Sequence, residues 1–101
     1  MQYETLTFDV PVGANGIGES KPIKRHRIKS FYFSGTFDAT ATIWISPEKV
    51  PTTWYPTTAV CVGADAPKVV TLEHACEHAR VVVSGWASGQ TVVKFGGYDV
   101  V

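Results

Sequence analysis

Short runs in which apolar and polar residues alternate, separated by glycine, proline and asparagine, dominate the chain. Residues 2–10 alternate in this way, and Pro11 ends the run because proline has no backbone N–H for strand pairing. In residues 37–45 the apolar side chains share one face: Phe37, Ala39, Ala41, Ile43 and Ile45. Alternation with period two, in runs rich in β-branched and aromatic residues, predicts half-buried β-strands.

Runs of the same character predict further strands over residues 24–33, 59–63, 68–72, 79–85 and 91–95. Gly96, Gly97 and the closing YDVV are expected to form a bent final strand. About seven or eight strands in 101 residues predict an all-β fold, an antiparallel β-sandwich of jelly-roll or immunoglobulin-like topology. The one helical alternative covers residues 72–80, whose apolar side chains would share a helix face. The pair Ser34-Gly35 predicts a hairpin turn or a bulge.

Two segments are too rich in glycine or proline for central strands. Residues 12–22 hold three glycines and Pro22, and they predict a mobile arm or a long loop, which is unusual in so small a domain. Residues 46–58 read SPEKVPTTWYPTT, and their three prolines predict a loop that carries Trp54 and Tyr55.

Length and composition predict one folded domain that spans residues 1–101. The 45% hydrophobic content excludes global disorder, and nine basic residues balance nine acidic ones. This balance removes the bulk attraction that most nucleic-acid-binding and membrane-binding proteins use, so we expect neither partner. No apolar run reaches the length of a membrane helix, and the first ten residues alternate where a secretory signal is apolar. We therefore expect synthesis in the cytoplasm.

Basic residues concentrate in the run KPIKRHRIK, which holds five of the nine cations. On a strand, Arg25, Arg27 and Lys29 would project from one face, and the ordinary interpretation is the solvated face of an edge strand. The functional interpretation is docking on an acidic protein surface. We expect these three residues, with Asn15 and Ile17 of the glycine-rich segment, to contact a partner protein.

Four aromatic residues offer an alternative kind of site: Trp44, Trp54, Tyr55 and Trp86. Flat aromatic rings on a rigid β scaffold can stack on the apolar faces of sugars. Packing in the core and anchoring of loops are commoner roles for such residues. A carbohydrate-binding module therefore stays open as an alternative function, which requires that these rings be exposed in a row.

Other candidate chemistry is weak. The segment GANGIGESK spaces its glycines like a phosphate-binding loop, but Glu19 stands where that loop needs a lysine. His74 and His78 have the spacing of metal ligands, yet no third ligand is evident. Cys61 and Cys76 are expected to be buried thiols, with a single disulfide as the open alternative. The chain has no nucleophile motif. We expect a non-enzymatic protein without a cofactor or a metal.

Two segments carry a specific order of residues. In FYFSGTFDATATIWISPEKVPTTWYP the residues of interest are Gly35, Thr36, Phe37, Ala39, Thr40, Thr42, Ile43, Ser46, Glu48, Thr53 and Trp54. In HARVVVSGWASG they are Arg80, Val82, Ser84 and Gly85. Together they resemble small all-β virion proteins of tailed bacteriophages, over less than half of the chain. The glycine-rich segment and the basic run have no counterpart in that pattern, and the turn SPEKVP is longer than the usual S-x-D-G.

This resemblance implies a non-enzymatic virion structural protein, and a capsid decoration or cement protein that binds the major capsid protein fits best. A tail or head-tail connector component that binds tail subunits is the nearest alternative. Because virion sites are symmetric, a homo-oligomer is expected. Pairing of residues 2–10 or of the glycine-rich segment with a neighbouring sheet would supply affinity through main-chain hydrogen bonds.

Overall fold

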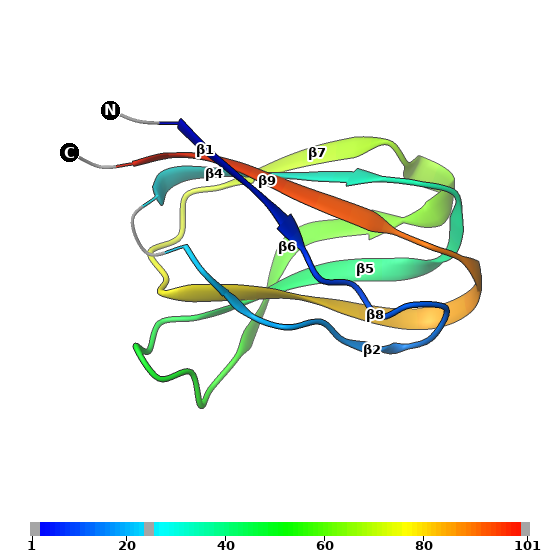
Figure 1. Cartoon of the computed structure of the whole chain (residues 1–101), viewed down its shortest axis with the longest axis horizontal. Coiled ribbons are helices and arrows are strands. Elements are labelled where there is room, and N and C mark those ends of the chain that lie inside the picture. The colour runs from blue at the N-terminus through cyan, green and yellow to red at the C-terminus, as the bar shows by residue number, and fades with distance from the viewer. Residues whose placement is uncertain (1–2, 24–25, 100–101) are drawn as a thin grey trace.

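β-Strands make up most of the computed structural model, which describes residues 3–23 and 26–99 (Figure 1). Within these ranges there is no α-helix, and no helix has the length and apolarity needed to cross a bilayer. The elements in order are β1 (Tyr3–Phe8), β2 (Gly16–Ile17), β3 (Lys21–Pro22), β4 (His26–Ser34), β5 (Phe37–Ser46), β6 (Tyr55–Val62), the 3-10 turn η1 (Gly63–Asp65), β7 (Lys68–Leu72), β8 (His78–Gly89) and β9 (Val92–Asp99).

The strands form two antiparallel sheets that pack face to face. The first sheet has the order β1-β9-β4-β7, and the second has the order β2-β8-β5-β6, with β3 also paired to β8. Among the strands described, β5 and β6 are consecutive and pair with each other. The connections β4–β5, β6–β7, β7–β8 and β8–β9 all change sheets. An immunoglobulin sandwich places its last strand with the third and sixth strands. Here β9 lies between β1 and β4, which is the jelly-roll order.

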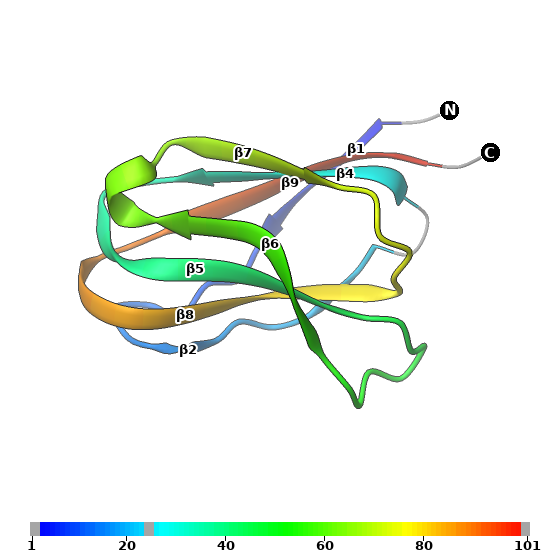
Figure 2. The same cartoon turned by 180° about the vertical axis from the view of Figure 1, so that it is seen from behind.

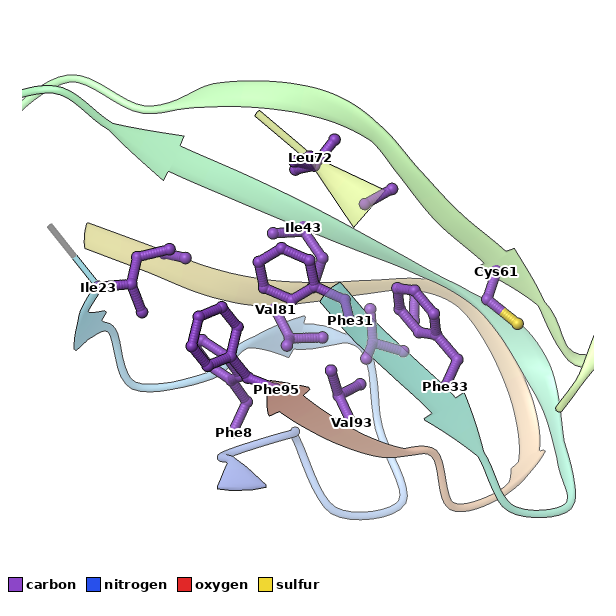
Figure 3. Packing of buried hydrophobic residues seen from close by; sticks show 14 of the residues in the cluster. Phe8, Ile23, Phe31, Phe33, Ile43, Cys61, Leu72, Val81, Val93 and Phe95 are labelled. Atoms are coloured by element: carbon purple, nitrogen blue, oxygen red, sulfur yellow. The ribbon is translucent and has the colours of Figure 1, made fainter. Parts of the chain in front are cut away.

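The core lies between the sheets and combines large residues from one sheet with smaller ones from the other (Figure 3). The first sheet contributes the rings of Phe8, Phe31, Phe33 and Phe95. The second sheet contributes mainly alanine and β-branched residues, and Figure 3 shows Ile43 and Val81 facing the rings. Alternation of large and small side chains across facing sheets fills the space without voids.

Most expected strands are present, and β7 has the predicted bounds. The expected loop over residues 46–58 is shorter, because β6 already begins at Tyr55 and includes Pro56. Proline is tolerated there because β6 is the edge strand of its sheet. The helical alternative over residues 72–80 is wrong, since a loop separates β7 from β8. Likewise β9 (Val92–Asp99) runs unbroken through Gly96 and Gly97 in place of a separate strand, and the last two residues of the expected strand lie outside the described residues.

The turn at Ser34 and Gly35 does not close a hairpin, because β4 and β5 belong to different sheets. It lies beside the turn between β8 and β9, where the amide of Gln90 donates to the carbonyl of Thr36 at 3.1 Å. Gly35 has φ 98°, in the region that favours glycine. The two turns thus cross between the sheets at the same end of the sandwich, as Figure 1 shows.

The glycine-rich segment is not a free arm. Gly16 and Ile17 pair with Val83 and Val82 of β8, and β3 pairs with the start of the same strand. The segment therefore forms an interrupted edge strand of the second sheet. The sequence between the glycines is too short and irregular to predict a strand by itself.

Candidate functional site

Glu48 orders the loop between β5 and β6, which extends away from the sandwich in Figure 2. Its carboxylate accepts hydrogen bonds from the Thr52 amide at 3.0 Å, the Thr52 hydroxyl at 2.8 Å and the Thr53 amide at 2.7 Å. The Glu48 amide donates to the hydroxyl of Ser46 at 3.4 Å. The Ser, Glu and Thr of the phage-like pattern therefore build one loop, in which the carboxylate satisfies backbone donors that no strand partner reaches.

Arg80 joins this loop to the second phage-like segment. Its guanidinium lies over the ring of Trp54, 4.0 Å from the ring centroid, which is cation–π geometry. Arg80 is directly opposite Trp44 in the pairing of β5 with β8. Its Nε is buried without a hydrogen-bond partner among the residues described. The two segments that are distant in sequence thus meet at one corner of the second sheet.

We expect Glu48→Gln to loosen this loop in a pH-dependent way. The hydrogen bond from the Thr52 hydroxyl, and then those from the Thr53 and Thr52 amides, lower the pKa of Glu48. A carboxyl group whose pKa is lowered in the folded state stabilises that state above its unfolded pKa, and this contribution is lost as the pH falls through the folded pKa. Thermal unfolding should therefore give a midpoint a few degrees lower for the variant at pH 7 and equal midpoints in acid, below the usual value of 4.5.

Glu19→Gln provides the control for this prediction, because Glu19 is an exposed carboxylate outside the loop. Its midpoint should follow that of the unchanged protein at every pH. A Glu48→Gln midpoint that stays equally depressed in acid would contradict the role of the ionised carboxylate.

The three expected partner-binding cations do not share a solvated face. Lys29 is only 2% exposed and lies on the inner face of β4, so its expected projection into solvent is wrong. Arg27 is exposed, and Arg25 lies outside the described residues. The register of β4 against β9 shifts between His26 and Ile28, which interrupts simple alternation at this end.

Lys29 instead fastens the loop between β7 and β8. Its ammonium donates to the carbonyl oxygen of His74 at 2.7 Å and to that of Arg27 at 3.5 Å. Burial lowers the pKa of Lys29, while Cys76 and Glu73 act in the opposite direction. Two carbonyl acceptors partly replace the water that this ammonium loses on folding.

Asn15 and Ile17 are both exposed, but only the Asn15 side chain is shown in a hydrogen bond within the chain. The Asn15 side-chain oxygen accepts a hydrogen bond from the amide of Trp86 at 2.7 Å, so part of its polar capacity is used within the chain. Ile17 is 57% exposed, and it lies opposite Val82 on the outer face of the second sheet. Of the two, the Ile17 side chain is therefore the better candidate for contact with a partner protein.

The four aromatic candidates do not form one row. Trp54 is covered by Arg80, and Trp44 lies beside them on β5. Trp86 is six residues along β8 from Arg80, a separation of about 20 Å at the usual strand rise. Its indole N–H donates to the carbonyl of Gly89 at 2.9 Å, and its ring packs against the core. Tyr55 is the most exposed of the four, at 54%, and the three tryptophans are half-buried.

The candidate histidines and cysteines lie in different environments. The His78 ring, through Nε2, is 3.0 Å from the carbonyl oxygen of Lys49, whereas His74 is exposed. Cys61 and Cys76 are free, buried thiols, and burial raises the pKa of both. Within residues 3–23 and 26–99, no three side chains of the metal-ligating types come together.

Tyr32 and Tyr98 are surface residues that the sequence analysis missed. Each lies on the outer face of the first sheet, and with Tyr3 they are exposed by 44%, 44% and 54% respectively. The sequence does indicate that Tyr32 is exposed. It stands between Phe31 and Phe33, and strand alternation that buries the two phenylalanines turns the tyrosine outward. Their gathering depends on the order of strands from distant parts of the chain.

Fold and surface together define a small jelly-roll β-sandwich whose prominent features are side-chain clusters on its sheet faces. Comparison with protein-family models, with curated protein sequences and with solved structures finds no match to this chain.

Proposed function

We propose that this chain is a non-enzymatic structural component of a bacteriophage particle, a capsid decoration protein that binds the major capsid protein. The observation that carries the proposal is the stacking of Arg80 on Trp54 at 4.0 Å. It brings together the two segments that resemble phage virion proteins, beside the loop that Glu48 orders. The two segments also pair along the length of β5 and β8, so the resembling residues are neighbours in the fold. Jelly rolls are also recurrent in viral capsid proteins, which supports the proposal at the level of fold.

The outer face of the second sheet is the docking surface in this proposal. A cross-strand row of Ile17, Val82, Thr42 and Val60 runs over β2, β8, β5 and β6. Ile17 is 57% exposed, and Val62 on the edge strand is 46% exposed. A mainly apolar row of this kind suits attachment to a protein surface that is apolar at its centre.

The test is the presence of the chain in particles from a phage whose genome encodes it. Peptide mass spectrometry of purified particles should detect the chain at a copy number comparable with that of the major capsid protein. Particles made without the gene should regain it when purified recombinant protein is added. Absence of the chain from particles would overturn the proposal, and confinement to tails would replace it with the connector alternative.

Ile17→Asp should weaken this rebinding about tenfold or more, because a carboxylate would be placed in an apolar contact. Val50→Asp is the matched control, since Val50 is 77% exposed and lies in the loop outside the row. Rebinding is measured by co-sedimentation with the particles. Equal loss in both variants would show that the outer face of the second sheet is not the docking surface.

A further inference from the structure

Three tyrosines gather on the outer face of the first sheet, away from the proposed docking surface. Tyr3, Tyr32 and Tyr98 come from β1, β4 and β9, which are neighbours in the sheet. The ring centroids of Tyr3 and Tyr98 are 5.1 Å apart, with the rings tilted by 54°. Loss of solvation, and then the proximity of the Tyr32 phenol, raise the pKa of Tyr3. Tyr3 therefore contacts Tyr98 and shares a pocket lining with Tyr32.

Gly96 is the reason that Tyr3 can lie across the sheet. This glycine is opposite Thr5 on β1 and Ser30 on β4, and its missing side chain leaves the backbone open between them. A Cβ at this position would meet the phenol of Tyr3. Tyr3 thus extends over β9 toward Tyr32, and its ring lies directly on the backbone of β9 at Gly96.

A pocket of about 500 Å³ opens beside these rings, and we call it the tyrosine pocket. It is lined by Tyr3, Thr5, Leu6, Thr7, Tyr32, Lys94 and Phe95. Lys94 is opposite Thr7 on one side and Tyr32 on the other, so its side chain belongs to the outer face. The lining combines aromatic faces, hydroxyl groups and one ammonium, and it contains no carboxylate. The volume lies in the range of small-molecule sites.

The lining of the tyrosine pocket favours a ligand that has an apolar face, several hydroxyl groups and a negative charge. Phenol rings offer an apolar face for stacking and a hydroxyl for hydrogen bonding. The threonine hydroxyls add donors and acceptors, which suits a ligand rich in hydroxyl groups. Lys94 is the only charged group in the lining, so the complementary ligand carries a negative charge. A sugar ring with a carboxylate combines an apolar C–H face, hydroxyls and that charge.

We propose that the tyrosine pocket binds an acidic saccharide, a uronic acid unit of a polysaccharide, with its ring against Tyr32 and its carboxylate on the ammonium of Lys94. The site is on the opposite sheet from the aromatic residues that the sequence suggested for carbohydrate binding. It stands independently of the capsid proposal, because no residue of the pocket belongs to the docking row.

Affinity electrophoresis of the purified full chain tests this proposal. Native gels contain polygalacturonate, the uncharged polysaccharide dextran, or poly-glutamate, and they report binding as retardation. We expect retardation by polygalacturonate alone. Tyr32→Ala and Lys94→Gln should each weaken it about tenfold, since each removes one contact of the sugar.

Tyr55→Ala and Lys49→Gln are the matched controls, because both residues are exposed and lie outside the tyrosine pocket. Both should bind polygalacturonate as the unchanged protein does, and thermal unfolding confirms that all four variants fold. Absence of retardation by polygalacturonate would overturn the proposal. So would equal retardation by dextran, which needs no charge, or by poly-glutamate, which needs no sugar. Loss of binding in Tyr55→Ala would place the site elsewhere.

Discussion

Replacing Phe31 with alanine is expected to lower the free energy of unfolding by about 3–5 kcal/mol. Phe31 is fully buried, and its ring centroid lies 5.3 Å from that of Phe95 and 5.9 Å from that of Phe8. Truncation removes the apolar contacts of a whole ring and leaves a cavity between two sheets that paired strands hold in place. For a small domain, this is a large part of the total stability.

Urea unfolding followed by tryptophan fluorescence measures this loss. Tyr32→Ala is the control, because Tyr32 is the next residue on β4 but faces solvent, and it should cost about 1 kcal/mol or less. A loss below about 1.5 kcal/mol for Phe31→Ala would contradict the rigid aromatic cluster.

Gly35→Ala is expected to cost about 3 kcal/mol or more. Gly35 has φ 98°, which an L-residue with a side chain adopts only with strain. A Cβ there would also meet the carbonyl oxygen of Gln90, because the β4–β5 and β8–β9 turns pack against each other. Backbone on both sides holds these turns, so the clash cannot be relieved by moving a flexible side chain.

Gly85→Ala separates the two contributions. Gly85 also has a positive φ, 61°, but no atom lies within 4 Å of a Cβ at that position. It should cost about 1–2 kcal/mol, the backbone strain alone. Equal losses for the two variants in chemical unfolding would show that the contact between the turns has no energetic consequence.

The crossing between sheets at Gly35 explains why the phage-like pattern has a glycine at this position. The chain crosses from one sheet to the other at that point, beside a second crossing that begins at Gly89. Much of the pattern is therefore structural: Phe37, Ala39 and Ile43 are buried, and Glu48 orders a loop. Such residues specify the fold. Two pattern residues, Thr42 and Val82, lie in the proposed docking row, whereas Ile17 and the residues of the tyrosine pocket lie outside the pattern.

Local pattern was sufficient for some elements and misleading for others. The alternation from Phe37 to Ile43 predicts the buried face of β5, because a strand with one face in the core must alternate. Lys29 shares its parity with Phe31 and Phe33, so the same rule places it inside. The positive charges around it favoured the opposite interpretation. Two carbonyl oxygens near its ammonium make burial tolerable, and one of them belongs to His74, on a distant loop.

The sequence by itself determined the class of the fold, one antiparallel β-sandwich, because period-two alternation is a local consequence of the strand backbone. The choice of the jelly-roll order depended on which strands pair, and that is decided by contacts between distant residues. The tyrosine pocket shows the difference most clearly. Tyr3, Tyr32 and Lys94 come together only because β9 lies between β1 and β4. Alternation predicts which way a side chain points, whereas only the tertiary structure decides which side chains become its neighbours.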